Sequence, residues 1–164
     1  MKKQITTKTV KKIPTVAKAM AGKAEDHKVN PSLAHGLKVK RGVDGLGLFT
    51  EVPIKKEEFI IEYWGPILND EEVELRGGKY LFEVKKNNTI DGTHRANTAR
   101  YINHSCRPNC EIEIKKGRVL VYAKRAIKPS EELCYDYGKE YWNEYIKPKG
   151  CRCVKCKEKL VAKK

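Results

Sequence analysis

Three cysteines fall within six residues near the C-terminal end of the 164-residue chain: Cys151, Cys153 and Cys156. The Cys-x-x-Cys pair has the spacing of a zinc knuckle, and Cys151 supplies a third thiolate beside it. No apolar stretch near the N-terminus predicts a secretory signal, so this cluster favours metal binding over disulfide bonds. A structural zinc site needs a fourth ligand, which must come from elsewhere in the chain.

Two longer segments combine polar and aromatic side chains. Residues 100–110 read Arg-Tyr-Ile-Asn-His-Ser-Cys-Arg-Pro-Asn-Cys, and residues 131–138 read Glu-Glu-Leu-Cys-Tyr-Asp-Tyr-Gly. In this order, and followed by the cysteine cluster, they resemble the motifs of the SET-domain lysine methyltransferases and their post-SET cysteines. Three shorter pieces also lie in the family's order: Gly45-Leu46-Gly47, Tyr63-Trp64-Gly65 and Tyr80-Leu81-Phe82. The resemblance covers about residues 36–158.

The resemblance implies a fold and a division of the chain. It predicts a mostly-β SET domain of small, β-clip-like sheets with few short helices, over residues 36–146. A C-terminal pseudoknot is expected to bring the Asn-His-Ser and Tyr-Asp-Tyr segments to one pocket, against the usual rule that chains do not thread loops. Residues 147–164 are then a zinc-binding post-SET segment with a basic tail, and residues 1–35 a disordered basic arm.

The implied reaction is methyl transfer from S-adenosylmethionine to the side-chain amine of a protein lysine, leaving S-adenosylhomocysteine. The sulfonium methyl is already activated, so the difficulty lies with the lysine, whose reference pKa is about 10.4. A sulfonium charge ~4 Å away costs the ammonium roughly 4 kcal/mol at an effective dielectric constant near 20, or about three pKa units. A dedicated base is then optional, and what remains is alignment in a dry aromatic channel.

Residue roles follow from the same resemblance. Tyr137 matches the catalytic tyrosine, and Tyr63, Phe82 and Tyr135 match the walls of the lysine channel. The matching cofactor-binding positions are Gly45, Leu46, Gly47, Tyr80, Arg100, Asn103, His104 and Tyr137. Trp142 either packs over the cofactor or anchors the flap, as we call the zinc-binding C-terminal segment, residues 147–164. Taken singly, each tyrosine would indicate core packing and the glycine pair a plain turn; only the ordered set indicates a site.

Tyr135 occupies the position that resembles the family's phenylalanine/tyrosine switch. A hydroxyl there can hold the target nitrogen directly or through a water, in the space that an already methylated nitrogen needs. The resemblance therefore predicts mainly monomethyl-lysine as the product.

The family takes its fourth zinc ligand from the cysteine after Asn-His-Ser, here Cys106, giving the set Cys106, Cys151, Cys153 and Cys156. Cys110 or metal-free thiols are the alternatives. The cluster here is shorter than the family's common Cys-x-Cys-x4-Cys, which leaves the geometry of the site open. Cys134 is expected to be a small buried hydrophobic residue.

The net charge of +14 is concentrated at the ends of the chain. Residues 1–35 hold eight lysines against two acidic residues, and residues 147–164 hold eight basic residues against one. The intervening body, with 19 basic and 18 acidic residues, is close to neutral. A body shaped around a phosphate backbone is therefore disfavoured, although the tails could add sequence-independent contacts to nucleic acid.

A non-catalytic, zinc-containing basic module that binds nucleic acid or chromatin is the alternative function. No apolar run approaches the ~18 residues that a membrane span needs, so no membrane association is expected. The expected partner is a protein that presents an extended lysine-bearing segment, either a histone or another basic protein. The expected location is intracellular: nuclear or chromatin-associated in a eukaryote, cytoplasmic or host-directed in a bacterium.

Overall fold

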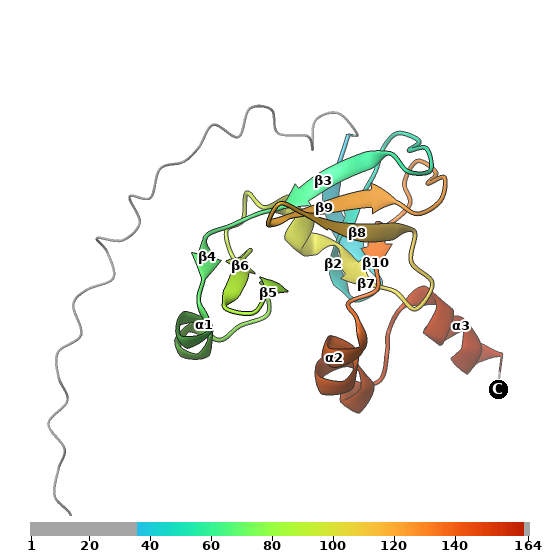
Figure 1. Ribbon diagram of the computed structural model, residues 1–164. Helices are drawn as coiled ribbons and strands as arrows, with labels where there is room; N and C mark the ends of the chain where they lie inside the picture. Colours follow the sequence, from blue (N-terminus) through green and yellow to red (C-terminus); the bar gives the residue numbers. More distant parts are fainter. Residues whose placement is uncertain (1–35, 163–164) are drawn as a thin grey trace, which may run out of the picture.

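The computed structural model describes residues 36–162 (Figure 1). The predicted N-terminal arm, residues 1–35, lies outside the described residues, as do the last two lysines. Within residues 36–162, no helix is both long and apolar enough to cross a bilayer.

Short strands in four small sheets form most of the fold. A three-stranded antiparallel sheet has the order β3-β9-β8, and a second has the order β4-β6-β5. The hairpin β1-β2 and the parallel pair β10-β7 make up the other two sheets. The strands are β1 (Lys38–Gly42), β2 (Gly45–Phe49), β3 (Phe59–Tyr63), β4 (Ile67–Leu68), β5 (Leu81–Lys85), β6 (Asn88–Asp91), β7 (Asn103–His104), β8 (Cys110–Lys115), β9 (Arg118–Ala123) and β10 (Cys134–Tyr135).

The α-helices are short and lie at the periphery, whereas the 3₁₀ turn η3 packs against β2 and β3 with Ala99 buried in the core. Helix α1 and the sheet β4-β6-β5 form one lobe, while α2 and α3 lie at the C-terminal side of the molecule (Figure 1). The helical elements are α1 (Asp70–Arg76), η3 (Thr98–Tyr101), α2 (Lys139–Tyr141), η4 (Trp142–Ile146), η5 (Lys147–Lys149) and α3 (Val154–Val161), of which η3 and η5 are 3₁₀ turns and η4 is a π-helical turn.

Local chemistry explains where the best-defined elements begin and end. Helix α1 starts with a capping box, in which the Asn69 side chain accepts from the backbone N–H of Glu72 and the Glu72 side chain accepts from that of Asn69. The β8-β9 hairpin turns through Lys116 and Gly117, both with positive φ (52° and 78°). That pair of left-handed residues matches the twist of the flanking strands.

The core lies where these sheets meet. Its most deeply buried side chains are 2% exposed or less and come from several sheets and from the segments between them: Leu48, Ile54, Ile60, Ile102, Val119, Val121, Ile127 and Leu133. Because strands distant in the sequence share this core, the loops that carry the predicted site residues are fixed relative to one another.

The structure confirms the predicted mostly-β fold of small sheets with few short helices. It differs from the pattern analysis in two places. The glycines of Gly45-Leu46-Gly47 lie in β2 and not in the turn, which passes through Val43 and Asp44. The C-terminal helix α3 was not anticipated from the sequence.

Candidate functional site

The parallel pairing of β7 with β10 brings together the two long motifs. Asn103 pairs with Cys134, and His104 pairs with Tyr135. The backbone N–H of Ser105 also donates to the carbonyl of Tyr135 over 3.0 Å. The Asn-His-Ser segment therefore lies directly beside the Tyr-Asp-Tyr segment, as the resemblance implied.

The predicted channel residues form two aromatic pairs. The ring centroids of Tyr63 and Phe82 are 5.6 Å apart, and those of Tyr135 and Tyr137 are 4.9 Å apart. Tyr63 lies close enough to Tyr135 and Tyr137 to affect the pKa of both. Tyr141, four residues after Tyr137, extends the cluster edge-on at 4.9 Å and was not singled out from the sequence.

Main-chain carbonyls hold two tyrosines of the cluster, the buried Tyr63 and the partly buried Tyr137. Tyr137 donates its hydroxyl hydrogen to the carbonyl of Ile102, and Tyr63 donates to the carbonyl of Tyr80, each over 2.7 Å. Tyr63 also depends on a glycine, because a Cβ at Gly92 would lie 2.2 Å from the tyrosine oxygen. The two hydroxyl oxygens are thereby fixed in place and keep lone pairs that can accept a hydrogen bond.

Burial raises the pKa of Tyr63, Tyr135 and Tyr137 above the usual value of 10.0. The charged phenolate is disfavoured in this apolar cluster, so each tyrosine keeps its proton at neutral pH. These residues can orient a nitrogen by hydrogen bonding, but they are poor general bases.

The predicted cofactor-binding residues line the neighbouring region. The Arg100 guanidinium lies 3.6 Å from the centroid of the Tyr80 ring and donates to the carbonyl of Thr93. Its Nε atom is buried without a hydrogen-bond partner, which is uncommon for a polar atom and fits a site that a polar ligand completes. A Cβ placed on Gly45 would meet no other atom within 4 Å, and the Leu46 side chain is 55% exposed. The unpaired donor and the open space at Gly45 are compatible with a polar ligand such as S-adenosylmethionine.

His104 links the segment that carries Tyr137 to the cysteine cluster. Its Nδ1 accepts from the backbone N–H of Tyr137 at 3.3 Å, so its proton lies on Nε2, which faces the sulfur of Cys106 at 3.4 Å. Burial lowers the pKa of His104 and so favours the neutral ring. The nearby Asp136 carboxylate has the opposite, smaller effect. The Trp142 ring packs on the same imidazole at 5.5 Å and ties η4 to this segment.

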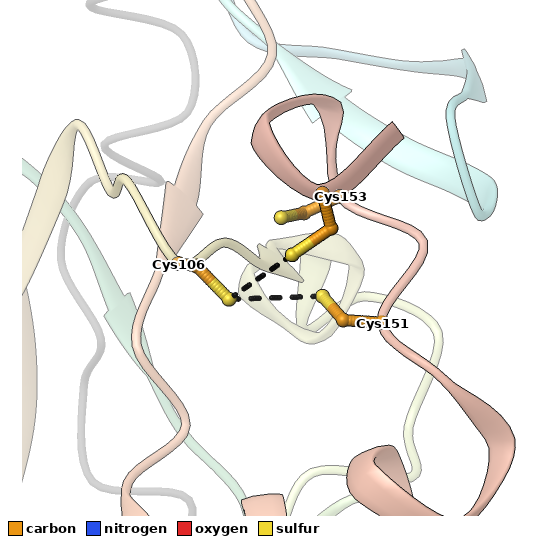
Figure 2. Close-up of side chains that lie close together, drawn as sticks. Cys106, Cys151 and Cys153 are labelled. Carbon is orange, nitrogen blue, oxygen red and sulfur yellow. Dashed lines mark hydrogen bonds between the residues drawn. The ribbon is translucent and has the colours of Figure 1, made fainter. Parts of the chain in front are cut away.

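The four predicted zinc ligands converge, as Figure 2 shows. The sulfur atoms of Cys106, Cys151, Cys153 and Cys156 all lie within 4.8 Å of one another. Cys106 is 3.8 Å from Cys151 and 3.7 Å from Cys156. A tetrahedral zinc with Zn–S bonds of about 2.3 Å requires sulfurs about 3.8 Å apart, so the set fits such an ion.

The short spacing of the cluster is accommodated by the start of α3. Cys153 is its N-cap residue and Cys156 lies one turn later, so both sulfurs project to one side. Burial raises the pKa of Cys153, but hydrogen bonds from the backbone N–H groups of Cys106 and Cys156 help to outweigh it and bring the pKa to about 7. Cys110, the alternative ligand, is buried beside Asn109 and outside the cluster.

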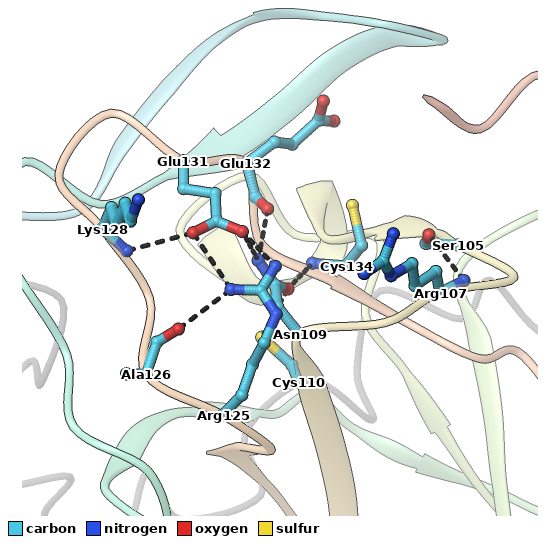
Figure 3. Close-up of polar contacts among 10 residues, drawn as sticks. All are labelled: Ser105, Arg107, Asn109, Cys110, Arg125, Ala126, Lys128, Glu131, Glu132 and Cys134. Atoms are coloured by element: carbon cyan, nitrogen blue, oxygen red, sulfur yellow. Dashed lines mark hydrogen bonds and ion pairs between the residues drawn. The ribbon is translucent and has the colours of Figure 1, made fainter. Parts of the chain in front are cut away.

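A polar network holds the strand that carries Tyr135. The buried Asn109 donates to Glu131 and to the carbonyl of Glu132, and its Oδ1 accepts from the backbone N–H of Cys134 at 2.8 Å (Figure 3). Glu131 in turn pairs with the Arg125 guanidinium. Sequence reasoning missed this network, although Asn109 and Glu131 both lie within the quoted motifs.

Two surface hollows lie elsewhere on the molecule. One is lined by residues 53–58 and 126–129, and the other by Glu57, residues 111–113 and Tyr122. Neither is lined by any of the predicted site residues. The two long motifs meet away from both hollows, where β7 pairs with β10.

Residues 45–138, more than half of the chain, match the SET domain family. The chain belongs to the SET-domain family. It is 37% identical over 129 residues to Histone-lysine N-methyltransferase trr of Drosophila melanogaster, which covers 71% of this chain and 5% of that protein. It is 38% identical over 134 residues to Histone-lysine N-methyltransferase ASHH3 of Arabidopsis thaliana. That alignment covers 73% of this chain and 36% of the relative.

A third relative is an Emericella nidulans protein named Histone-lysine N-methyltransferase, H3 lysine-4 specific, which is 40% identical over 111 residues. That alignment covers 60% of this SET-domain chain and 9% of the relative. The chain therefore spans only a small part of these relatives, from 5% to 36% of their length.

Proposed function

We propose that this SET-domain protein transfers a methyl group from S-adenosylmethionine to the side-chain amine of a protein lysine. The observation that carries the proposal is the meeting of the Asn103–His104 segment with Tyr135 and Tyr137 across β7 and β10. In this proposal, Asn103 and His104 contact the cofactor, and the partly buried Tyr135 and Tyr137 face the target lysine. The names of the relatives support the same activity.

When bound, S-adenosylmethionine supplies an activated methyl and a positive charge that lowers the pKa of a nearby lysine ammonium. The residues of the chain hold the target lysine in position for the transfer. Tyr63, Phe82 and Tyr135 enclose the aliphatic stem and attract the cationic head before it loses its proton. The hydroxyl of Tyr137, fixed on the Ile102 carbonyl, directs the amine along the line of attack. Access of water is restricted because Tyr63 is buried and Phe82, Tyr135 and Tyr137 are partly buried.

The remaining assignments form part of the proposal. Gly45–Gly47, Tyr80, Arg100, Asn103 and His104 bind the cofactor, and Trp142 anchors the flap on His104. The catalytic domain spans residues 36–146 and the zinc-binding segment residues 147–164. Cys106, Cys151, Cys153 and Cys156 hold a structural zinc, for which their sulfur spacing is suited.

We further propose that the substrate is a histone or another basic protein that presents an extended lysine-bearing segment. The proposed location is nuclear or chromatin-associated. The relatives' names include histone-lysine activity, and one of them specifies histone H3 lysine-4. Tyr135 at the switch position favours monomethyl-lysine as the main product.

Cofactor binding tests the proposal against a non-catalytic basic module. S-adenosylmethionine at 100 times its dissociation constant stabilises a folded protein by about 2.7 kcal/mol, which should raise the melting temperature by several degrees. Incubation with labelled cofactor and histone H3, followed by mass spectrometry, should then reveal methyl-lysine. Absence of both effects, with zinc still bound, would support the non-catalytic alternative.

A further inference from the structure

Two adjacent glutamates at the start of the Tyr-Asp-Tyr motif point in different directions. The carboxylate of Glu131 meets Arg125 and Asn109, whereas that of Glu132 points away from this network (Figure 3). The Glu132 carboxylate instead crosses to the β1-β2 hairpin and β7. There it accepts from Asn103 Nδ2 at 2.7 Å and from the backbone N–H of Val43 at 3.4 Å.

The Glu132 carboxylate explains why two hairpin positions lack a side chain. A Cβ at Gly42 would lie 2.5 Å from Glu132 Oε1, and a Cβ at Gly47 would lie 2.3 Å from it. Real Cβ atoms do not approach another atom so closely, so either methyl group would displace the carboxylate. Gly45 differs, because its Cβ position meets nothing within 4 Å. Of the two glycines in Gly45-Leu46-Gly47, the second is therefore required by Glu132.

The same carboxylate sets the orientation of the Asn103 amide. Asn103 Nδ2 donates both of its hydrogens, one to Glu132 and one to the carbonyl of Leu46 at 3.0 Å. A reversed amide would place its oxygen against two acceptors, which is unfavourable. Within residues 36–162, Asn103 Oδ1 has no hydrogen-bond partner, so it remains free as an acceptor.

We propose that Glu132 is a positioning residue, which clamps the β1-β2 hairpin against β7 and fixes the amide of Asn103 for cofactor binding. It acts through Asn103 and the hairpin and touches no reacting atom. This inference deepens the proposed function and rests on it for the identity of the cofactor. Its effect should fall on cofactor affinity and leave the aromatic lysine channel unchanged.

Calorimetry with S-adenosylhomocysteine tests the clamp in the full-length, zinc-loaded protein. Glu132→Ala should weaken binding by about tenfold, the equivalent of one hydrogen bond to a charged group. Glu132→Gln should lose less affinity than Glu132→Ala, because its amide oxygen can still accept from Asn103, although its amide nitrogen cannot accept from Val43. In steady-state assays, Glu132→Ala should raise the cofactor KM and leave kcat at saturating cofactor within about twofold. Unchanged affinity in Glu132→Ala would overturn the inference.

Gly42→Ala provides an independent test, since Gly42 is not among the predicted cofactor contacts. In the wild-type background this methyl group should displace the Glu132 carboxylate and weaken binding of S-adenosylhomocysteine as much as Glu132→Ala does. In the Glu132→Ala background it should add no further loss, because the two changes remove the same contact. The decreases in melting temperature caused by the two substitutions should likewise not add in the double variant. Additive losses in affinity and melting temperature would overturn the inference.

Gly65→Ala is the matched control, because its Cβ would lie 1.9 Å from the backbone oxygen of Asp91, away from Glu132. It should lower the melting temperature equally in both backgrounds. Wild-type protein that binds no S-adenosylhomocysteine would contradict the proposed function, and the cofactor role of Glu132 with it. Normal wild-type binding together with a neutral Glu132→Ala would contradict the clamp alone.

Discussion

At the residue scale, Tyr137 has a hydroxyl that is fixed before any substrate arrives. It donates to the Ile102 carbonyl over 2.7 Å, so its oxygen has a defined position and free lone pairs. Tyr137→Phe should lower turnover at least tenfold under single-turnover conditions, which corresponds to about 1.4 kcal/mol of barrier. The melting temperature and zinc content should change little, since the ring remains packed. An unchanged rate would rule out an orienting role.

The protonation of the tyrosine cluster leads to a prediction about pH. Burial raises the pKa of Tyr137 above 10.0, so the hydroxyl stays neutral through the working range. The target lysine instead gains neutral amine as the pH rises towards its pKa. The value of kcat/KM should therefore rise with pH from about 6.5 and show no falling limb up to about 9.5. A falling limb near pH 8–9 that Tyr137→Phe removes would show that the tyrosine does ionise.

Tyr135 governs the proposed product specificity. Within the described residues its hydroxyl has no hydrogen-bond partner, and its ring lies 4.9 Å from that of Tyr137. It can therefore hold the target nitrogen or an ordered water, and displacing such a water disfavours a nitrogen that already carries a methyl group. Tyr135→Phe should shift the products from monomethyl- toward di- and trimethyl-lysine with little loss in the first step. Efficient trimethylation by the wild type would contradict this role for Tyr135.

At the element scale, the C-terminal segment is attached to the catalytic domain by more than its cysteines. Arg152 pairs with Asp44 in the turn of the β1-β2 hairpin at 3.3 Å, and Lys157 donates to the carbonyl of Val43 at 3.2 Å. Both contacts reach the hairpin that carries the predicted cofactor glycines. Some basic side chains of the C-terminal segment therefore contact the rest of the protein. Because these contacts reach the hairpin, loosening the C-terminal segment should disturb cofactor binding.

Removal of one zinc ligand tests this connection. Elemental analysis should find one zinc per chain, and Cys153→Ser should lose it, because a tetrahedral site lacking one thiolate binds far more weakly. Affinity for S-adenosylhomocysteine and activity should then fall, as Cys106 and the neighbouring His104 lose their anchor. Cys134→Ala, which lies outside the cluster, should retain the metal. Full activity in metal-free protein would contradict both the site and its role.

At the scale of the whole molecule, local signals in the sequence predicted local structure. The capping box at Asn69 and Glu72 and the β8-β9 hairpin depend on residues a few positions apart, so structure of this kind can be predicted from the sequence. The approach of Cys106 to the C-terminal cysteines spans 45 residues or more and was expected only from the family resemblance. Periodicity and spacing carry no information about such distant contacts.

The features that sequence reasoning missed are long-range or depend on packing. Glu132 reaches Val43, 89 positions earlier, and the crowding at Gly47 becomes visible only with the carboxylate in place. The family resemblance assigns Gly47 to the cofactor site, and the structure adds a reason for glycine there, because a Cβ would collide with Glu132. The π-helical turn η4 follows directly after α2, and no local pattern in the sequence indicates this change of winding.

The distribution of charge over the chain leads to the last prediction. The body is almost neutral and some C-terminal basic residues make contacts within the fold, whereas residues 1–35 hold eight lysines against two acidic residues. Deleting residues 1–30 should leave turnover on a short peptide unchanged, because no family motif lies before Gly36. Binding to DNA or to acidic proteins should weaken, most strongly at low salt, where charges are least screened. The slope of log K against log salt concentration should flatten by up to about five, as expected for six net charges. Loss of peptide turnover in the truncated protein would instead show that this segment helps to build the catalytic domain.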